Sequence, residues 1–421
     1  MTRYRRLASL LCALALLWAA APPAMALTRD DLRALAADAA QPWPEEPFAE
    51  PPSIAAPYAA GALDEALIDA ALGRLNFVRT LAGLRPARAD DALCRLAQHG
   101  AVLMAAQKTV SHAPDPPGDM DADFFAQAAG AAANCSLASF NWFSPALAAE
   151  SMDWFVRDDT APNLGELAHR RWMLCPHMGR TGFGLALDGE GRSYAALYVT
   201  DLSAPDDYDF VLWPAPGAFP ADLMRAETPW SVSPNPVKCD LTRSAPHVLL
   251  EELTTGARWD FAGADADPAQ GAYCLIDDRS FGDGPALIFR PDLADWPALE
   301  DGYEQNQVWR ATVSGLTAAD GAPLEPVVYT VEMASLTPID PASVELSARS
   351  LALRPGETAA VGATVYPRWA DDLSCALSTS DSSVAVVDEN GLVTALAAGQ
   401  CLLRAEAVNG RFDEIEITVN E

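Results

Sequence analysis

The chain of 421 residues carries 58 acidic and 28 basic side chains, and its formal net charge at pH 7 is −30. A surface this acidic repels nucleic acid and anionic membranes, so we expect neither as a partner. At about 150 residues per domain, the length predicts two or three domains.

The first 26 residues are typical of a secretory signal peptide. Arg3, Arg5 and Arg6 form a basic start, an apolar run covers Leu7–Ala21, and Ala24-Met25-Ala26 is a small-x-small cleavage pattern. The apolar run is shorter than the roughly 20 residues of a membrane span; an uncleaved anchor is the alternative. We expect an exported chain that begins after residue 26 and has no further membrane span. Loss of three arginines would take its net charge from −30 to −33.

Residues 27–60 are rich in proline, alanine and acidic residues, which predicts an extended linker. Residues 61–203 mix helical and strand-like patterns. Apolar residues at helical spacing predict helices over Leu63–Leu81 and from Asp90 through Met104, and a weaker helix over Phe124–Ala133.

Ser144-Pro145 has the cap and first-position pattern of a further helix, which continues to Asp158. Strand-like runs over Phe183–Leu187 and Tyr194–Leu202 flank Asp188-Gly189-Glu190-Gly191, which is a hairpin signal. This segment therefore predicts one helix followed by two paired strands.

His169 lies in the most distinctive stretch of the chain, just before a proline ends its helix and a strand begins. Such a position suits a site residue, but a buried structural histidine explains the spacing equally well. The neighbouring Arg170 and Arg171 could bind an anion. We expect them instead to pair with carboxylates of this acidic chain.

Beyond Pro205 the chain changes to short alternating apolar runs separated by turn residues, which is typical of antiparallel β-sandwiches. Residues 206–336 form one predicted sandwich and residues 344–421 a second. In an oxidising compartment we expect cysteines to pair within domains. The predicted bridges are Cys239–Cys274, Cys375–Cys401 and Cys135–Cys175, with Cys94 left free.

Residues 61–203 resemble the CAP superfamily of cysteine-rich secretory, antigen 5 and pathogenesis-related proteins, in its bacterial form. The resemblance covers about a third of the chain. It rests on the order and spacing of these pieces: Leu75-Asn76-Phe77-Val78-Arg79, Gly83-Leu84-Arg85-Pro86, Ser111-His112, Trp154, His169-Arg170-Arg171-Trp172-Met173-Leu174 and Gly182-Phe183-Gly184.

The resemblance implies an α–β–α sandwich with a cleft in which His112 and His169 face each other and hold a divalent metal such as zinc. Relatives add two glutamates. One belongs to a Gly-Glu-Asn motif that aligns here with Ala132-Ala133-Asn134, so that carboxylate is missing. In place of the other we expect Asp158 or Glu150 as the nearest carboxylate. A catalytic zinc site usually has three protein ligands, so an incomplete set weakens the case for catalysis.

Residues 344–421 look like a group 2 bacterial Ig-like domain. The matching pieces are Leu353-Arg354-Pro355-Gly356-Glu357-Thr358, Val365-Tyr366-Pro367 and Asn390-Gly391-Leu392-Val393-Thr394-Ala395. Residues 206–336 look like a further Ig-like sandwich. The predicted fold class is α+β, with a CAP domain followed by two all-β Ig-like sandwiches.

Two main functions remain open. The first is a secreted or cell-surface, non-catalytic protein whose histidine-lined cleft binds a metal or a small apolar ligand and whose Ig-like domains act as spacers. Its partner would be an unknown cell-envelope or host surface ligand. The second is a metal-assisted extracellular hydrolase that uses the two histidines. The missing glutamate favours the first, and no Gly-x-Ser-x-Gly or His-Glu-x-x-His motif supports the second. A purely structural envelope component is a third possibility.

Overall fold

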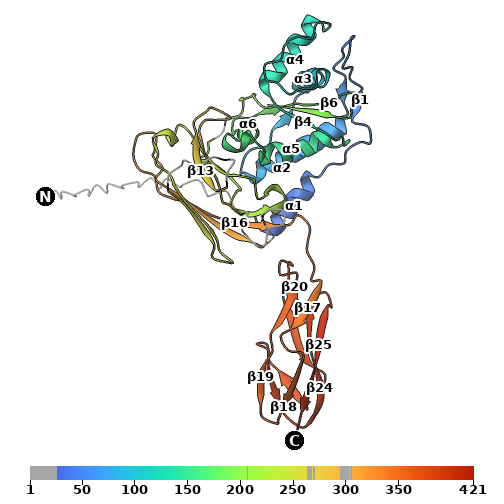
Figure 1. The fold of residues 1–421 in the computed structure, drawn as a ribbon, viewed down its shortest axis with the longest axis vertical. Helices are drawn as coiled ribbons and strands as arrows, with labels where there is room; N and C mark the ends of the chain where they lie inside the picture. Colours follow the sequence, from blue (N-terminus) through green and yellow to red (C-terminus); the bar gives the residue numbers. More distant parts are fainter. Residues whose placement is uncertain (1–25, 206, 263–267, 269–270, 294–302, 304–305) are drawn as a thin grey trace, which may run out of the picture.

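The computed structural model describes residues 26–205, 207–262, 268, 271–293, 303 and 306–421, which form three folded units (Figure 1). A helix-containing unit comes first, a two-sheet unit follows, and an elongated β unit stands apart from both. The predicted α+β fold class is confirmed. The predicted signal peptide, residues 1–26, lies outside the described residues except for Ala26.

The first unit is built around a three-stranded antiparallel sheet in the order β4-β7-β6, with bounds Cys135–Phe140, Ser193–Tyr198 and Phe183–Leu187. Strand side chains alternate between the two faces of a sheet. Leu185 accordingly packs in one core with α2 and α5, while Ala186 packs in another with α3 and α4. The expected α–β–α layering is present.

The helices follow the predicted pattern closely. Asp64 and Asp90 cap α2 and α3 with their side chains, as short polar residues do at helix starts. The predicted helix start at Ser144-Pro145 is two residues too early, because α5 begins at Leu147. The Ser144 hydroxyl accepts a hydrogen bond from the Ala146 amide, just before the helix. The bounds are α2 Glu65–Leu81, α3 Asp91–Gln107, α4 Ala122–Asn134, α5 Leu147–Arg157 and α6 Ala168–Met173, with short strands β1 Phe48–Glu50, β2 Ala62–Leu63, β3 Arg88–Ala89 and β5 Arg180–Thr181.

The expected extended linker over residues 27–60 is wrong for its first part, which forms helix α1 (Arg29–Ala39). Thr28 and Asp31 make a capping box at its start. Leu32, Leu35, Ala36 and Ala39 recur at helical spacing and pack against the main core. The proline content that suggested a linker begins only at Pro42, beyond the helix.

The second unit is a sandwich of a four-stranded and a five-stranded sheet, in the orders β13-β14-β10-β8 and β12-β11-β15-β16-β9. Aromatic rings fill the space between them. The Trp230 ring centroid of the first sheet lies 6.1 Å from that of Trp309 and 6.4 Å from that of Tyr329, both in the second. The bounds are β8 Phe210–Trp213, β9 Gly217–Pro220, β10 Trp230–Pro234, β11 His247–Glu252, β12 Arg258–Ala262, β13 Tyr273–Asp277, β14 Ala286–Arg290, β15 Val308–Ser314 and β16 Val327–Ala334.

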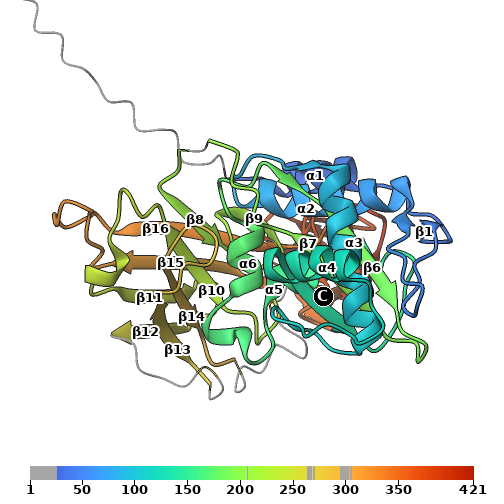
Figure 2. The same cartoon turned by 90° about the horizontal axis from the view of Figure 1, so that it is seen from above.

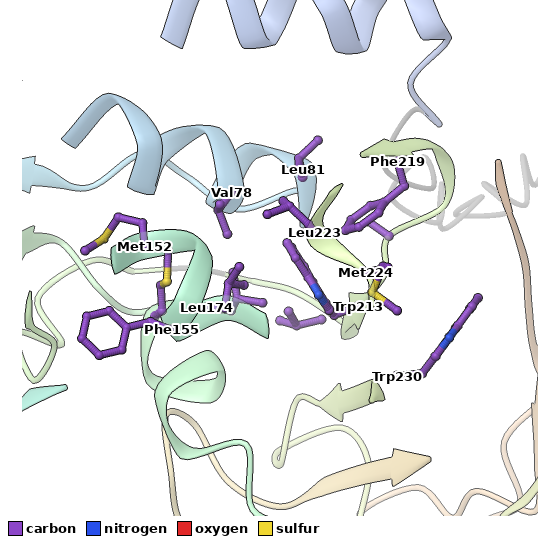
Figure 3. Packing of buried hydrophobic residues seen from close by; sticks show 14 of the residues in the cluster. Val78, Leu81, Met152, Phe155, Leu174, Trp213, Phe219, Leu223, Met224 and Trp230 are labelled. Atoms are coloured by element: carbon purple, nitrogen blue, oxygen red, sulfur yellow. The ribbon is translucent and has the colours of Figure 1, made fainter. Parts of the chain in front are cut away.

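The first two units share one continuous hydrophobic core (Figure 3). Trp213 and Leu223 of the sandwich are fully buried together with Val78 and Phe155 of α2 and α5. Figure 2 shows the two units side by side. They therefore form one packed body.

The C-terminal unit has a core of its own, separate from the first. Its sheets have the orders β18-β25-β24-β21, β19-β23-β22 and β17-β20. The bounds are β17 Ser343–Leu346, β18 Ser350–Leu353, β19 Thr358–Ala360, β20 Ala363–Tyr366, β21 Cys375–Thr379, β22 Ala385–Val387, β23 Leu392–Ala395, β24 Gly399–Ala407 and β25 Phe412–Val419.

The predicted disulfides are not formed. All seven cysteines of the described residues are free thiols. Strand register explains one case. Cys375 pairs with Ala407 on β24, and Cys401 lies six residues earlier on that strand. At about 3.3 Å per residue the two cysteines are roughly 20 Å apart, far beyond the about 6.8 Å that a disulfide spans.

Cys135 and Cys175 are separated by the sheet. Cys135 belongs to the core that β4 shares with α3 and α4. The carbonyl of Cys175 accepts a hydrogen bond from Arg79, on α2 at the opposite face. Burial raises the pKa of the Cys175 thiol to about 11, so it is also a poor nucleophile at neutral pH.

Candidate functional site

His169 lies in the first turn of α6, where its ring is held from three sides. Its Nδ1 is 2.9 Å from Asp158 Oδ1. Trp154 and Phe155 of α5 place their ring centroids 5.4 and 5.2 Å from the imidazole. Because a carboxylate only accepts, Nδ1 donates to Asp158, and Nε2 is the nitrogen left for a ligand.

Asp158 is buried and serves as the anchor of this helix. Its Oδ2 accepts hydrogen bonds from the amides of His169 at 3.0 Å and Arg170 at 3.2 Å. These amides open α6, whose own N-cap residue, Leu167, makes no side-chain cap. Both carboxylate oxygens of Asp158 are therefore engaged in holding α6.

His112 is placed elsewhere. It follows α3 and lies on the α4 side of the sheet, where its Nδ1 is 2.7 Å from the carbonyl oxygen of Ala132. His169 packs against α5, on the other side of the sheet. The two rings are thus held by contacts with different helices.

A metal ion shared by His112 and His169 would have to find its remaining ligands elsewhere. Among the residues that the structure describes, no group of three or more His, Cys, Asp or Glu side chains is placed to hold one. Ala133, which aligns with the family glutamate, is exposed in the last turn of α4. Glu150 is exposed and accepts a hydrogen bond from the Ser144 hydroxyl. Zinc binding by His112 and His169 stays a prediction from the resemblance.

Comparison with known families agrees with this architecture. Residues 72–200 match the profile of the cysteine-rich secretory protein (CAP) family, and residues 341–415 match that of the group 2 bacterial Ig-like domain. The chain contains a CAP domain and a bacterial Ig-like domain. No curated protein matches the chain.

Similarity to solved structures is weak. Domains 4 and 5 of the S-layer protein SbsC are 12% identical over 27% of this chain and 65% of theirs, with a TM-score of 0.18. A C-terminal intimin fragment, solved in complex with the intimin-binding domain of its translocated receptor, is 12% identical over 46% and 57%, with a TM-score of 0.15. Extracellular domains 3–5 of Drosophila OTK are 13% identical over 52% and 66%, with a TM-score of 0.22. The chain spans 39–65% of the SbsC structures, and scores this low carry no argument.

Arg170 and Arg171 of the CAP domain fasten it to the sandwich. Arg170 is fully enclosed and donates to the carbonyl oxygens of Val156 and Pro229. Arg171 forms a buried ion pair with Asp277 on β13. The expected pairing with a carboxylate is confirmed for Arg171, whereas Arg170 donates to backbone carbonyl oxygens of both units instead.

A hollow of about 620 Å³ adjoins Trp154 on the outer side of α5. It is lined by parts of the CAP domain and by Arg225 of the sandwich. Sequence patterns could not reveal this surface, because its residues come from four separate segments. Its lining is Ser139, Phe140, Asn141, Trp142, Glu150, Asp153, Trp154, Arg157, Arg192 and Arg225.

Proposed function

We propose that this protein is an exported, non-catalytic binding protein that acts at a cell surface. The CAP domain and the sandwich bind the ligand, and the Ig-like domain serves as a spacer. Bacterial Ig-like modules and an expected signal peptide support export. Among the described residues, every helix is too short or too polar to cross a bilayer.

The engagement of Asp158 carries the non-catalytic part of this proposal. A hydrolytic site needs a positioned carboxylate or imidazole that takes up the proton of an attacking water. The buried carboxylate near His169 already accepts from two amides and the imidazole. Its contacts are those of a helix anchor.

The His169–Asp158 pair nevertheless keeps hydrolysis as a second candidate function. A carboxylate that orients the Nδ1–H of a histidine, leaving Nε2 to take a proton, is the arrangement of a general base. His169 is 13% exposed, so its ring is not fully closed to solvent.

Hydrolysis assays on residues 27–421 distinguish these two candidates. We expect no hydrolysis of casein, peptide or ester substrates above background, with or without added zinc. Hydrolysis that disappears in His169→Ala and persists in His247→Ala would overturn the non-catalytic proposal. His247 is a suitable control because it lies on the sandwich and pairs with Asp260.

Surface binding is tested separately with fluorescently labelled residues 27–421. We expect the protein to sediment with envelopes of the producing cell or with host cells, and to be displaced by unlabelled protein. Failure to sediment with either surface would overturn the binding role.

A further inference from the structure

The groove beside α5 presents cations in a protein whose charge is strongly negative. Arg157, Arg192 and Arg225 line it together with two carboxylates. Arg192 and Arg225 take part in no ion pair within the described part of the chain, and both are exposed. Asp153 is already paired with Arg74 at 2.5 Å. An anion in the groove would therefore meet two guanidinium groups, those of Arg192 and Arg225, that are unpaired among the described residues.

Arg157 shows that positive charge in the groove is incompletely neutralised. Its side chain is 15% exposed, and its Nε is buried without a hydrogen-bond partner among the described residues. Its nearest carboxylate oxygen, on Asp159, is 3.7 Å away. Burial lowers the pKa of Arg157, and the nearby charge of Arg225 lowers it further. The negative charge of a bound carboxylate would offset both effects.

Flat aromatic surface lies directly beside these cations. The ring centroid of Phe140 is 5.6 Å from that of Trp142 and 5.7 Å from that of Trp154. Trp142 remains 45% exposed, and the adjacent Phe143 is 41% exposed. The Ser193 hydroxyl fixes the loop by donating to the Trp142 carbonyl at 2.9 Å. Exposed aromatic rings with a polar surround are typical of ligand surfaces.

The groove also contains polar groups that can form hydrogen bonds with the hydroxyls of a ligand. Ser139 and Asn141 offer neutral donors and acceptors, and Glu150 is an exposed acceptor. Its volume of about 620 Å³ falls in the range of about 300–1,000 Å³ typical of ligand sites. Guanidinium groups bind carboxylates in a bidentate manner, and aromatic rings pack on apolar ring faces.

We propose that this groove binds an acidic oligosaccharide, with uronic acid carboxylates on Arg157 and Arg225 and a sugar ring stacked on Trp142. An acidic peptide fits less well, since it offers few hydroxyls to Glu150 and no flat ring to the indole. This inference rests on the proposed binding function and names its ligand class. Because Arg225 belongs to the sandwich, the site exists only while both units share their core.

Calorimetric titration of residues 27–421 with trigalacturonate tests the proposal. Maltotriose serves as the neutral sugar and hexaglutamate as the acidic peptide. We expect trigalacturonate to bind with a Kd below about 1 mM and at least tenfold more tightly than either control. Its affinity should fall as salt is raised, because the guanidinium–carboxylate contacts are partly screened.

Substitutions in the groove give the second readout. We expect Arg225→Gln and Trp142→Ala each to weaken trigalacturonate binding by about tenfold. Arg88→Gln, which changes an exposed arginine of the CAP domain outside the groove, should leave it unchanged. Circular dichroism of each variant checks that the fold is intact.

Absence of trigalacturonate binding, equal binding of hexaglutamate, or an unchanged Arg225→Gln variant would each overturn the inference. Its failure is distinguishable from failure of the proposed function. A protein that ignores trigalacturonate but still sediments with cell surfaces refutes only the ligand class. A protein that hydrolyses its substrates refutes the function itself.

Discussion

At the scale of single residues, the chemistry around His169 is decided by the hydrogen bonds that the Asp158 carboxylate accepts. The backbone of Asp158 lies in the left-handed region with φ of 51° at the end of α5, a conformation that aspartate tolerates better than most residues. From there it reaches the start of α6. One side chain thus links the end of one helix to the start of the next.

Asp158→Ala should lower the free energy of unfolding by about 2–4 kcal/mol, because it leaves two amides and the His169 Nδ1–H without acceptors in a buried setting. Chemical denaturation measures the change. Glu150→Ala is the matched control, since it removes an exposed carboxylate, and should cost under about 0.5 kcal/mol. Similar costs for both variants would contradict the anchoring role.

At the scale of elements, the closest packing in the CAP domain is that of α3 on β6. A Cβ added to Gly182 would lie 2.2 Å from the carbonyl carbon of Leu93, and one added to Gly184 would lie 2.3 Å from the carbonyl oxygen of Ala97. The helix backbone therefore rests directly on the strand. Only glycine permits this approach.

Gly184→Ala should destabilise the protein by about 3 kcal/mol, since helix backbone rather than a flexible side chain must move. Thermal unfolding followed by circular dichroism provides the measurement. Gly189→Ala, in the nearby β6–β7 turn, is the control, because nothing lies within 4 Å of its added Cβ. A neutral Gly184→Ala variant would show that α3 is not seated this closely.

At the scale of the whole molecule, helix α1 ties the Ig-like domain to the rest of the chain. Arg33 Nη2 donates to Asp371 at 2.8 Å, and Arg29 pairs with both Asp371 and Glu332. Asp371 also accepts from the Ile339 amide in the connecting segment. The Asp371 carboxylate thus joins α1 and the connecting segment to the Ig-like domain.

This attachment should weaken in acid. Burial raises the pKa of Asp371, but the hydrogen bonds and charges of Arg33 and Arg29 outweigh it and lower the pKa below its usual value. The pairing therefore stabilises the attachment above the unfolded-state pKa of about 3.9 and is lost as pH falls further, through the folded-state pKa. We expect Asp371→Asn at neutral pH to widen the distribution of interdomain distances in small-angle X-ray scattering. Asp381→Asn, which removes a carboxylate that bonds only within the Ig-like domain, should not.

The two hydrophobic cores predict which fragments fold. Residues 344–421 should unfold cooperatively alone, since their core is separate. Residues 27–203 should not unfold cooperatively alone, because Trp213 and Leu223 complete their core. Residues 27–336, which include both side chains, should do so. Calorimetry of the three fragments is the measurement. A cooperative transition for residues 27–203 would show that the shared core is dispensable.

The sequence by itself determined the parts of this protein that depend on local patterns. Apolar spacing and caps located α2 and α3, and the turn residues at Asp188–Gly191 located the β6–β7 hairpin. The order of short motifs identified the CAP and Ig-like domains, because each motif contains residue types that the local backbone conformation requires. The pairing of Arg171 with a carboxylate also followed from the excess of acidic residues in the chain.

Only the tertiary structure decided the docking of α1, the contacts of His112 and His169, the free state of Cys375 and Cys401, and the groove beside α5. Each depends on which segments meet. A disulfide depends on strand register, and the groove gathers side chains from β4, α5, a hairpin and the sandwich. Residue types fix what a side chain can bind, but its neighbours follow from long-range packing, which single-sequence periodicity does not encode.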